Sequence, residues 1–423
     1  MTKEFTKYVL SNGVRVLLVP QAGSVATTVA VAVEAGSEYE SKEVNGISHF
    51  LEHMCFKGTT KRPRPIDIAS ELDGLGANYN AFTGEEYTSY YAKVKNEDFH
   101  RALDIVTDLY LHPTFPVAEI EKEKGVIIEE INMYEDLPQR KVGELFTHLV
   151  YGDQPAGRSI LGPKEVIRGI TREDFLKYRG AHYVPEATVV IVAGGFDEAK
   201  ARENVEAHFG ALPAGPKTAK ATVTEEQTAP RELVHFKESD QTHLVMGFRA
   251  FDIHDERQYA LEVLEDILGG GMGSRLFQRV REELGAAYYV RASTDLYFDH
   301  GLFTMSAGAA HGKLETVLKA GLEEFMRFTT ESVDEETLAR AKRHLNGTFA
   351  LALETSDSLG YYYGGQEIMH LPILTPTEYL AKINAVTAGE IQSVARTLFR
   401  SDRLNLALIG PYKDKSFGDI LKI

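Results

Sequence analysis

The sequence predicts an α+β fold made of two similar tandem domains, each an antiparallel β-sheet packed against helices. Two observations predict it. Segments with β-rich or alternating apolar residues are followed by segments of helical periodicity, first over residues 14–134 and again from residue 242 onward. The order of the segments is similar in both halves, as expected for a degenerate duplication of one unit of about 200 residues.

Each element is predicted from its local pattern. Residues 14–19 and 26–34 alternate or run continuously in β-branched and apolar residues, which is typical of strands. The other elements expected in the first half are a helix after residue 34, a helix at 67–72, strand-like residues 76–94, helices at 98–111 and 117–134, and a strand at 188–193. The second half is expected to contain a strand at 242–249, helices at 255–268 and 274–283, strands within 287–307, and helices from residue 314 onward.

A linker is predicted between the two halves. Between about Leu212 and Leu233 the composition shifts to Pro, Ala, Lys, Thr and Glu, and apolar periodicity almost disappears. We therefore expect an N-terminal domain over residues 1–215, a linker over 216–232 and a C-terminal domain over 233–423.

Composition narrows the class of protein. The 423 residues carry a formal net charge of −16, without the clustered Lys and Arg that nucleic-acid backbones require, although such acidity can also serve solubility alone. The N-terminus lacks a signal-peptide pattern and no apolar run is long enough to span a membrane, so we expect a cytoplasmic protein without nucleic-acid or membrane partners. The single cysteine, Cys55, excludes a cysteine-only metal cluster within one chain.

The strongest chemical pattern is the segment Gly46-Ile-Ser-His-Phe-Leu-Glu-His53. His49 and His53 are one helical turn apart, so their imidazoles project side by side and can share one metal ion. Glu52 lies beside them, where it can take a proton from a water molecule on zinc. The alternative is that both histidines are ordinary helix residues.

A catalytic zinc usually needs a third protein ligand, and the helix predicted over 117–134 offers candidates. Glu123 and Glu130 are two helical turns apart on a face that also carries Ile127, so this face points inward. An inward-facing carboxylate needs a partner. We choose Glu130 as the third ligand and Glu123 as the residue that orients a ligand histidine, although either can also be a surface carboxylate.

The order H-x-x-E-H is that of the inverzincins, and the sequence resembles the pitrilysin and insulysin family. It is most similar to the short-chain branch, which contains mitochondrial processing peptidase and its bacterial relatives. The resemblance extends from Leu10-Ser-Asn-Gly13 through His49-Phe-Leu-Glu-His-Met-Cys-Phe-Lys-Gly-Thr59 to Gly269-Gly-Gly-Met-Gly-Ser-Arg-Leu276. It implies a zinc metalloendopeptidase with one zinc ion per chain, in which Glu130 matches the third ligand and Glu123 the assisting carboxylate.

The same resemblance implies residues that contact a peptide substrate. Asn80, Ala81 and Phe82 match the edge strand on which the family holds its substrate extended. Phe56 matches a position that lines the pocket after the scissile bond, although a core aromatic is an equal alternative.

In the second half, Arg281 and Tyr288 match a pair that contacts the substrate and stabilises the oxyanion. A solvated arginine at a helix end and a tyrosine of a strand core are the alternatives for these two residues.

The short-chain branch also implies an assembly. We expect a homodimer that encloses a chamber for peptide substrates. The alternatives are a catalytic subunit that requires an inactive homologous partner, a non-catalytic scaffold subunit, or a metallohydrolase that acts on other substrates. Manganese or cobalt can also occupy such a site.

Overall fold

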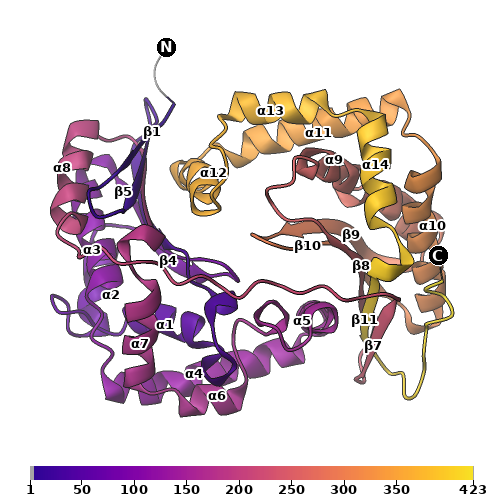
Figure 1. Cartoon of the computed structure of the whole chain (residues 1–423), viewed down its shortest axis with the longest axis horizontal. Helices are drawn as coiled ribbons and strands as arrows, with labels where there is room; N and C mark the ends of the chain where they lie inside the picture. The colour runs from indigo at the N-terminus through magenta and orange to yellow at the C-terminus, as the bar shows by residue number, and fades with distance from the viewer. Residues whose placement is uncertain (1–3, 423) are drawn as a thin grey trace. The chain divides into compact units, whose positions relative to one another are not determined.

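The computed structural model describes residues 4–422 and separates into two compact units (Figure 1). The first unit comprises Met1–Ile131, Ser159–Ala221 and Ala350–Thr375. The second unit comprises Asn132–Arg158, Thr222–Phe349 and Pro376–Ile423. Each unit therefore combines segments from both halves of the sequence.

A six-stranded sheet forms the centre of the first unit. Its strands follow the order β1 (Thr6–Val9), β2 (Arg15–Pro20), β6 (Thr188–Gly194), β3 (Ala26–Val33), β5 (Thr88–Lys95) and β4 (Asn78–Thr83). All neighbours are antiparallel except β2 and β6, which are parallel. The strand-like stretch predicted over 76–94 is a hairpin of two strands, β4 and β5, and β4 is the edge strand of the sheet.

Helices cover this sheet. Residues of β2, β3 and β6 are buried almost throughout, as expected for strands packed on both faces. Helix α3 packs on β3 and β5, and α12 packs on β2, β3 and β6. The helices of the unit are α1 (Ile47–Cys55), α2 (Pro65–Gly74), α3 (Phe99–Leu111), α4 (Val117–Asp136, shared with the second unit), α6 (Lys164–Gly169), α7 (Arg172–His182), α8 (Glu198–Phe209) and α12 (Ser356–Ile368).

The second unit is built in the same way around five strands. Their order is β7 (Arg231–Phe236), β11 (Leu404–Gly410), β8 (Thr242–Ala250), β10 (Gly301–Ala309) and β9 (Ala287–Leu296). Its helices are α5 (Pro138–Tyr151), α9 (Gln258–Gly269), the π-helical segment Phe277–Glu283, α10 (Leu314–Thr330), α11 (Glu335–Ala352, shared with the first unit), α13 (Pro376–Ala385) and α14 (Ala388–Leu398). Along β11, Leu406 and Leu408 belong to one apolar core and Ala407 and Ile409 to the other, so both faces of this sheet are buried.

The two sheets share one topology. From β2 onward, the first sheet repeats the order of the second, with a parallel pair at one side and an edge strand, β4 or β9, at the other. The predicted α+β fold of two similar domains is confirmed, and each mostly antiparallel sheet contains one parallel pair that the prediction lacked. The parallel pair arises because β6 and β11 return to their sheets after long helical segments.

Two helices pack with strands from the other half of the sequence. Helix α5 packs on β7, β8 and β11, and α12 packs on the first sheet. Polar contacts add to the packing of α12, since Ser356 hydrogen-bonds Thr28 at 2.9 Å and Asp357 pairs with Lys93 at 2.7 Å. The compact units thus differ from the predicted domains 1–215 and 233–423, because an apolar helix face is buried wherever a complementary sheet face is available.

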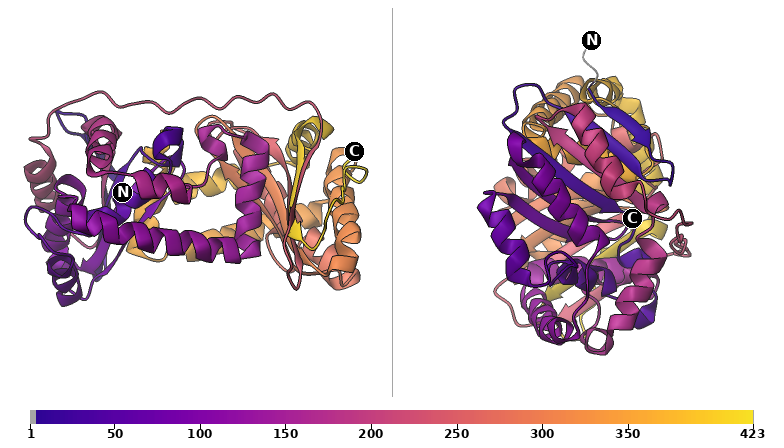
Figure 2. Two further views of the ribbon diagram at one scale, coloured as in Figure 1. Left: turned by 90° about the horizontal axis from the view of Figure 1, so that it is seen from below. Right: turned by 90° about the vertical axis from the view of Figure 1, so that its left-hand side faces the viewer.

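The predicted linker, residues 216–232, has no regular secondary structure before β7 begins at Arg231 (Figure 2). Its first part is nevertheless anchored to the first unit. Lys217 pairs with Glu34, and Lys220, only 8% of whose side chain is exposed, pairs with Glu38 and Glu86. Both lysines pair with buried carboxylates, a feature that the Pro- and Thr-rich composition does not indicate.

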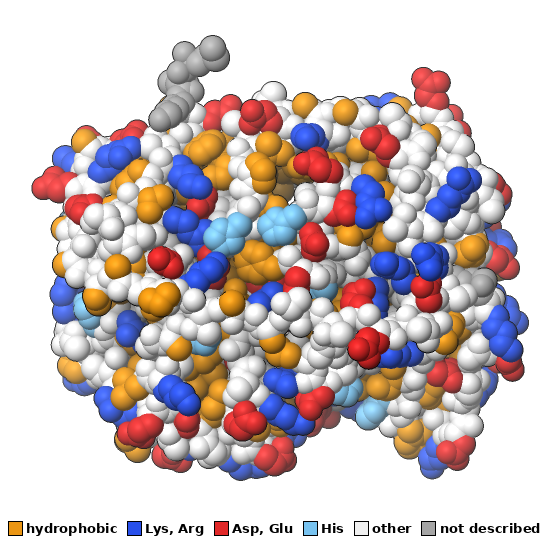
Figure 3. Space-filling view, viewed as in Figure 1, with side chains coloured by type: hydrophobic (Ala, Val, Ile, Leu, Met, Phe, Trp, Pro, Cys, Tyr) orange, Lys and Arg blue, Asp and Glu red, His pale blue; other side chains and the backbone are white. Residues whose placement is uncertain are grey.

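Charged side chains are distributed without a dominant basic patch on the face shown in Figure 3, where Lys and Arg alternate with Asp and Glu. Among residues 4–422, no helix combines the length and the apolar composition that crossing a membrane requires.

The docking of α12 on β6 gives a stability prediction. A Cβ atom at Gly364 would lie 2.2 Å from Cδ1 of Ile191, whereas a Cβ at Gly365 would meet no atom within 4 Å. Gly364→Ala is therefore expected to lower the free energy of unfolding by about 1–3 kcal/mol through overpacking. Gly365→Ala, the matched control, should be neutral or stabilise the helix by up to about 1 kcal/mol. Urea unfolding measures both, and equal stability of the two variants would contradict this packing.

Candidate metal centre

Helix α1 carries three of the predicted site residues, and its start is fixed by the backbone. It begins after Gly46, whose φ of 97° lies in the left-handed region that glycine tolerates. A Cβ at this position would also lie 2.6 Å from the carbonyl oxygen of Leu161. Glycine is therefore required at the point where the chain enters the helix.

A buried carboxylate closes the N-terminus of α1. Glu40 accepts hydrogen bonds from the backbone N–H groups of Gly46 (2.7 Å) and Ser48 (2.8 Å) and from the amide of Asn45 (2.8 Å). A negative charge is favourable there because it meets the unpaired N–H groups and the helix dipole. Burial nevertheless raises the pKa of Glu40 to about 7, against the lowering effect of these hydrogen bonds. Sequence reasoning missed Glu40, which precedes the helix by several residues and forms no local capping pattern.

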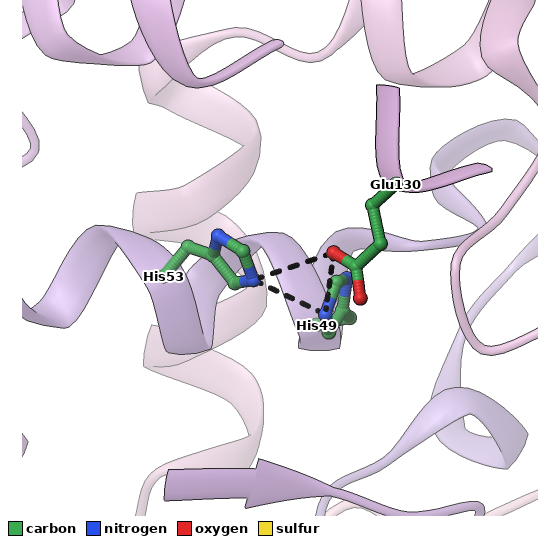
Figure 4. Close-up of side chains that lie close together, drawn as sticks. All are labelled: His49, His53 and Glu130. Atoms are coloured by element: carbon green, nitrogen blue, oxygen red, sulfur yellow. Dashed lines mark hydrogen bonds and ion pairs between the residues drawn. The ribbon is translucent and has the colours of Figure 1, made fainter. Parts of the chain in front are cut away.

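The structure brings His49, His53 and Glu130 together (Figure 4). The two Nε2 atoms lie 3.2 Å apart. Oε2 of Glu130, on α4, lies 3.7 Å from Nε2 of His49 and 3.8 Å from Nε2 of His53. Three potential ligand atoms from two helices thus form a small triangle, and the three side chains all face its centre.

These distances fit a divalent metal ion. Tetrahedral zinc with bonds of about 2.0–2.1 Å places neighbouring ligand atoms roughly 3.3 Å apart. The observed separations of 3.2, 3.7 and 3.8 Å lie close to this value. Two imidazoles and one carboxylate are also a donor set that zinc prefers when a fourth position is left for water or substrate.

Glu123 holds the ring of His53 in place. Its carboxylate accepts a hydrogen bond from Nδ1 of His53 at 2.8 Å and pairs with Nζ of Lys57 at 2.6 Å. Burial by itself raises the pKa of Glu123, but these two hydrogen bonds outweigh it and the pKa lies below its ordinary value. An ionised Glu123 places the ring proton on Nδ1, so that the lone pair of Nε2 faces His49 and Glu130.

His49 is kept neutral by its surroundings. Burial, with a smaller contribution from His53, lowers its pKa to about 3. A neutral imidazole is the form that binds metal ions. Within the described residues its Nδ1 atom has no hydrogen-bond partner, so no carboxylate orients this ring as Glu123 orients that of His53.

Glu52 lies on the same helix, and its carboxylate is held by a residue that the sequence did not single out. Thr83 donates a hydrogen bond from Oγ1 to Oε2 of Glu52 at 2.5 Å. Burial, with a contribution from Glu130, raises the pKa of Glu52, while Thr83 and His53 lower it. No sequence pattern indicated this contact, because it joins a strand end and a helix 31 residues apart.

The residues predicted to hold substrate lie on and near the edge strand. Asn80, Ala81 and Phe82 are on β4, which ends the sheet. The ring of Phe82 packs against Tyr87 and against Tyr361 of α12, with 5.6 Å between centroids in each pair. Phe56 directly follows α1, half-buried, with its ring centroid 6.5 Å from that of Tyr90.

Arg281 and Tyr288 come together in the second unit. The guanidinium carbon of Arg281 lies 5.5 Å from the ring centroid of Tyr288 and 4.8 Å from that of Phe277. Tyr288, near the start of edge strand β9, is 71% exposed, which excludes the alternative of a core tyrosine. The two residues belong to a different compact unit from the three candidate metal ligands.

The chain matches two family models. Residues 15–164 match the model described as insulinase, peptidase family M16, and residues 169–345 match the model described as the peptidase M16 inactive domain. The first match contains His49, Glu52, His53 and Glu130, and the second contains Arg281 and Tyr288.

Relatives extend over nearly the whole chain. The chain is 37% identical to the uncharacterized zinc protease YmxG of Bacillus subtilis, covering 96% of this chain and 98% of that protein. It is 38% identical to an uncharacterized zinc protease of Rickettsia felis, covering 99% and 100% of the two chains.

Two solved structures share the fold. A protease from Helicobacter pylori matches with a TM-score of 0.89 at 20% identity, over 96% of this chain and 99% of that one. The structure described as a peptidase M16 inactive domain from Pseudomonas fluorescens matches with a TM-score of 0.90 at 20% identity, over 98% and 100%.

The contact between Glu123 and His53 predicts a change in metal affinity. Glu123→Gln removes the charged acceptor at Nδ1 of His53, so zinc affinity should fall by about 10- to 100-fold. Glu129→Gln, an exposed position on the same helix, is the control and should leave the affinity unchanged. Competition with a zinc chelator measures both constants. Equal affinity in wild type and Glu123→Gln would contradict the orienting role.

Proposed function

The chain belongs to peptidase family M16, the insulinase family, and from this premise we propose that it is a zinc-dependent endopeptidase that hydrolyses peptides held in extended conformation. The observation that carries the proposal is the convergence of His49, His53 and Glu130, whose ligand atoms lie 3.2–3.8 Å from one another. The names of the relatives, which are zinc proteases, support zinc as the metal.

His49, His53 and Glu130 would hold one zinc ion per chain. When bound, the ion would act as a Lewis acid, lowering the pKa of the attacking water and polarising the scissile carbonyl. The protein prepares the site for it in two ways. Burial keeps His49 neutral, and Glu123 fixes the tautomer of His53, so both rings offer a lone pair.

Glu52 acts as the general base in this proposal. It takes a proton from the attacking water and later delivers a proton to the leaving amine. Its half-buried position and its neighbour Glu130 raise its pKa above that of an exposed carboxyl, which makes it a better proton acceptor. Glu52 directly precedes the candidate ligand His53 on α1, which supports a location beside the metal ligands.

Substrate is proposed to pair with β4, where Asn80, Ala81 and Phe82 lie. An edge strand offers backbone hydrogen bonds that do not depend on substrate sequence, so selectivity comes from side-chain pockets and should be broad. Phe56 remains a prediction for one such pocket. The roles of Arg281 and Tyr288 as substrate contacts and oxyanion donors, the homodimer with its closed chamber, and the cytoplasmic location also stay predictions.

A catalytic subunit that needs an inactive partner is the main alternative. The match of residues 169–345 to the model described as an inactive domain raises this alternative. That range lacks His49, His53 and Glu130, and the other matched range contains all three together with Glu52. This distribution supports an active chain in which the first half carries the metal chemistry.

Replacement of Glu52 tests the proposed function. Glu52→Gln removes the proton acceptor but none of the three metal ligands. We expect zinc content equal to wild type and a fall in the hydrolysis of quenched fluorescent peptides by at least about 100-fold. Metal analysis and initial rates measure the two quantities, with Glu129→Gln as the carboxylate-to-amide control. Full activity in Glu52→Gln would overturn the base assignment, and a zinc-loaded wild type without peptidase activity would favour the alternative subunit roles.

A further inference from the structure

The side chain that holds Glu52 belongs to the edge strand on which substrate is proposed to bind. Thr83 is the last residue of β4, and its hydroxyl lies 2.5 Å from the Glu52 carboxylate. Among residues 4–422, no other side chain or backbone group donates a hydrogen bond to this carboxylate. The orientation of Glu52 therefore depends on one contact, and the inference that follows rests on the proposed function.

The register of the hairpin shows which side of β4 is open. The backbone N–H of Gly84 donates to the carbonyl of Tyr87 at 2.9 Å, so this pair is a hydrogen-bonded pair of the antiparallel ladder. Hydrogen-bonded pairs alternate with non-hydrogen-bonded pairs along an antiparallel ladder. The next pair, Thr83 with Thr88, is therefore non-hydrogen-bonded, and so is the pair of Ala81 with Tyr90 two residues further along. The backbone groups of Thr83 and Ala81 consequently face away from β5, towards the open edge.

An independent contact supports this register. The backbone N–H of Ala81 donates to the side-chain oxygen of Asn80 at 2.9 Å, which a group bonded to β5 would not do. Asn80 thus satisfies an outward-facing N–H that a substrate strand would otherwise meet. Ala81 and Thr83 are two residues apart, so their backbone N–H and C=O groups both point to the open edge of β4.

The backbone and the side chain of Thr83 therefore point to different places. Its backbone groups lie on the edge that an extended peptide would join, and its side chain lies on the face of the sheet towards α1. Phe82, the preceding residue, points to the opposite face, where its ring packs against Tyr361 of α12. A peptide bound along this edge would lie against the residue that holds the base.

Among the described residues, Thr83 supplies the one hydrogen bond that holds the Glu52 carboxylate in a single orientation. A glutamate side chain loses substantial conformational freedom when it is fixed, and the half-buried carboxylate of Glu52 lies in the field of the carboxylate of Glu130. A single short hydrogen bond from a strand is a rigid anchor, because β4 is itself paired to β5 over its whole length.

We propose that Thr83 is a positioning residue that fixes the Glu52 carboxylate relative to the substrate-binding edge of β4. A base misplaced by about 1 Å can lose on the order of 100-fold in rate. Loss of the hydroxyl should therefore slow the chemical step and leave substrate pairing, which uses the backbone of Thr83, in place. This separates a positioning role from a structural one.

Thr83→Val tests the proposal because valine keeps the shape of threonine and removes the donor. We expect kcat to fall by about 10- to 100-fold with KM changed less than about 3-fold, and with zinc content and melting temperature equal to wild type. Thr83→Ser, which restores a hydroxyl, should recover most of the rate. Thr60→Val, at an exposed threonine of the first unit, is the control for the chemical change.

A second comparison uses Glu52→Gln as background. If Thr83 acts through Glu52, Thr83→Val should add little to the loss already caused by Glu52→Gln. A multiplicative loss in the double variant, or a Thr83→Val effect confined to KM, zinc content or melting temperature, overturns the positioning role and leaves the proposed function standing. An unchanged rate in Thr83→Val, while Glu52→Gln is inactive, likewise overturns the positioning role and leaves the proposed function standing. Full activity in Glu52→Gln overturns the proposed function and this inference together.

Discussion

The candidate site depends on the immobilisation of one short helix. Helix α1 has nine residues, and three of them are His49, Glu52 and His53. Such a short helix is not stable alone in water, so its position must come from its surroundings. Glu40 closes its N-terminus, Gly46 allows the close approach of the chain at its start, and Phe50, Leu51 and Met54 are fully buried. The geometry of the imidazoles follows from this anchoring.

The electrostatics of the site favour a cation. Glu52, Glu123 and Glu130 lie around the two histidines, and Lys57 is bonded to Glu123. Because burial keeps His49 neutral, it adds no positive charge at ordinary pH. Burial is the main cause that raises the pKa of Glu52, and the nearby carboxylate of Glu130 adds to it. A divalent cation between Glu130 and the two neutral rings would offset the negative charge of the nearby carboxylates, and the separations of the three ligand atoms leave room for it.

The helix periodicity and the spacing of ligands could be predicted from the sequence because both are local. His49, Glu52 and His53 are fixed by positions within one turn, and the placement of Glu123 and Glu130 on one face follows from their separation by two turns. The duplication was visible in the order of elements, and the common strand order of the two sheets agrees with it.

Contacts between distant segments could not be predicted in this way. Glu40 and Thr83 act on α1 from outside any local pattern, and each becomes visible only when the sheet and the helix are in place. The exchange of α5 and α12 between the units has the same origin, because an amphipathic pattern shows that a face is buried and not which sheet buries it. The metal ligands can therefore be predicted from their spacing in the sequence, whereas the residues that hold α1 and Glu52 in place are identified only from the tertiary structure.

The most direct test is the zinc K-edge X-ray absorption spectrum of the zinc-loaded protein. We expect two imidazole nitrogens, with oxygen as the remaining ligands, at about 2.0–2.1 Å, and no sulfur at about 2.3 Å. The Glu130→Gln variant should lose the carboxylate contribution or the metal itself. A spectrum with a sulfur ligand, with fewer than two imidazoles, or one that Glu130→Gln leaves unchanged would contradict the convergence of His49, His53 and Glu130 on a single ion.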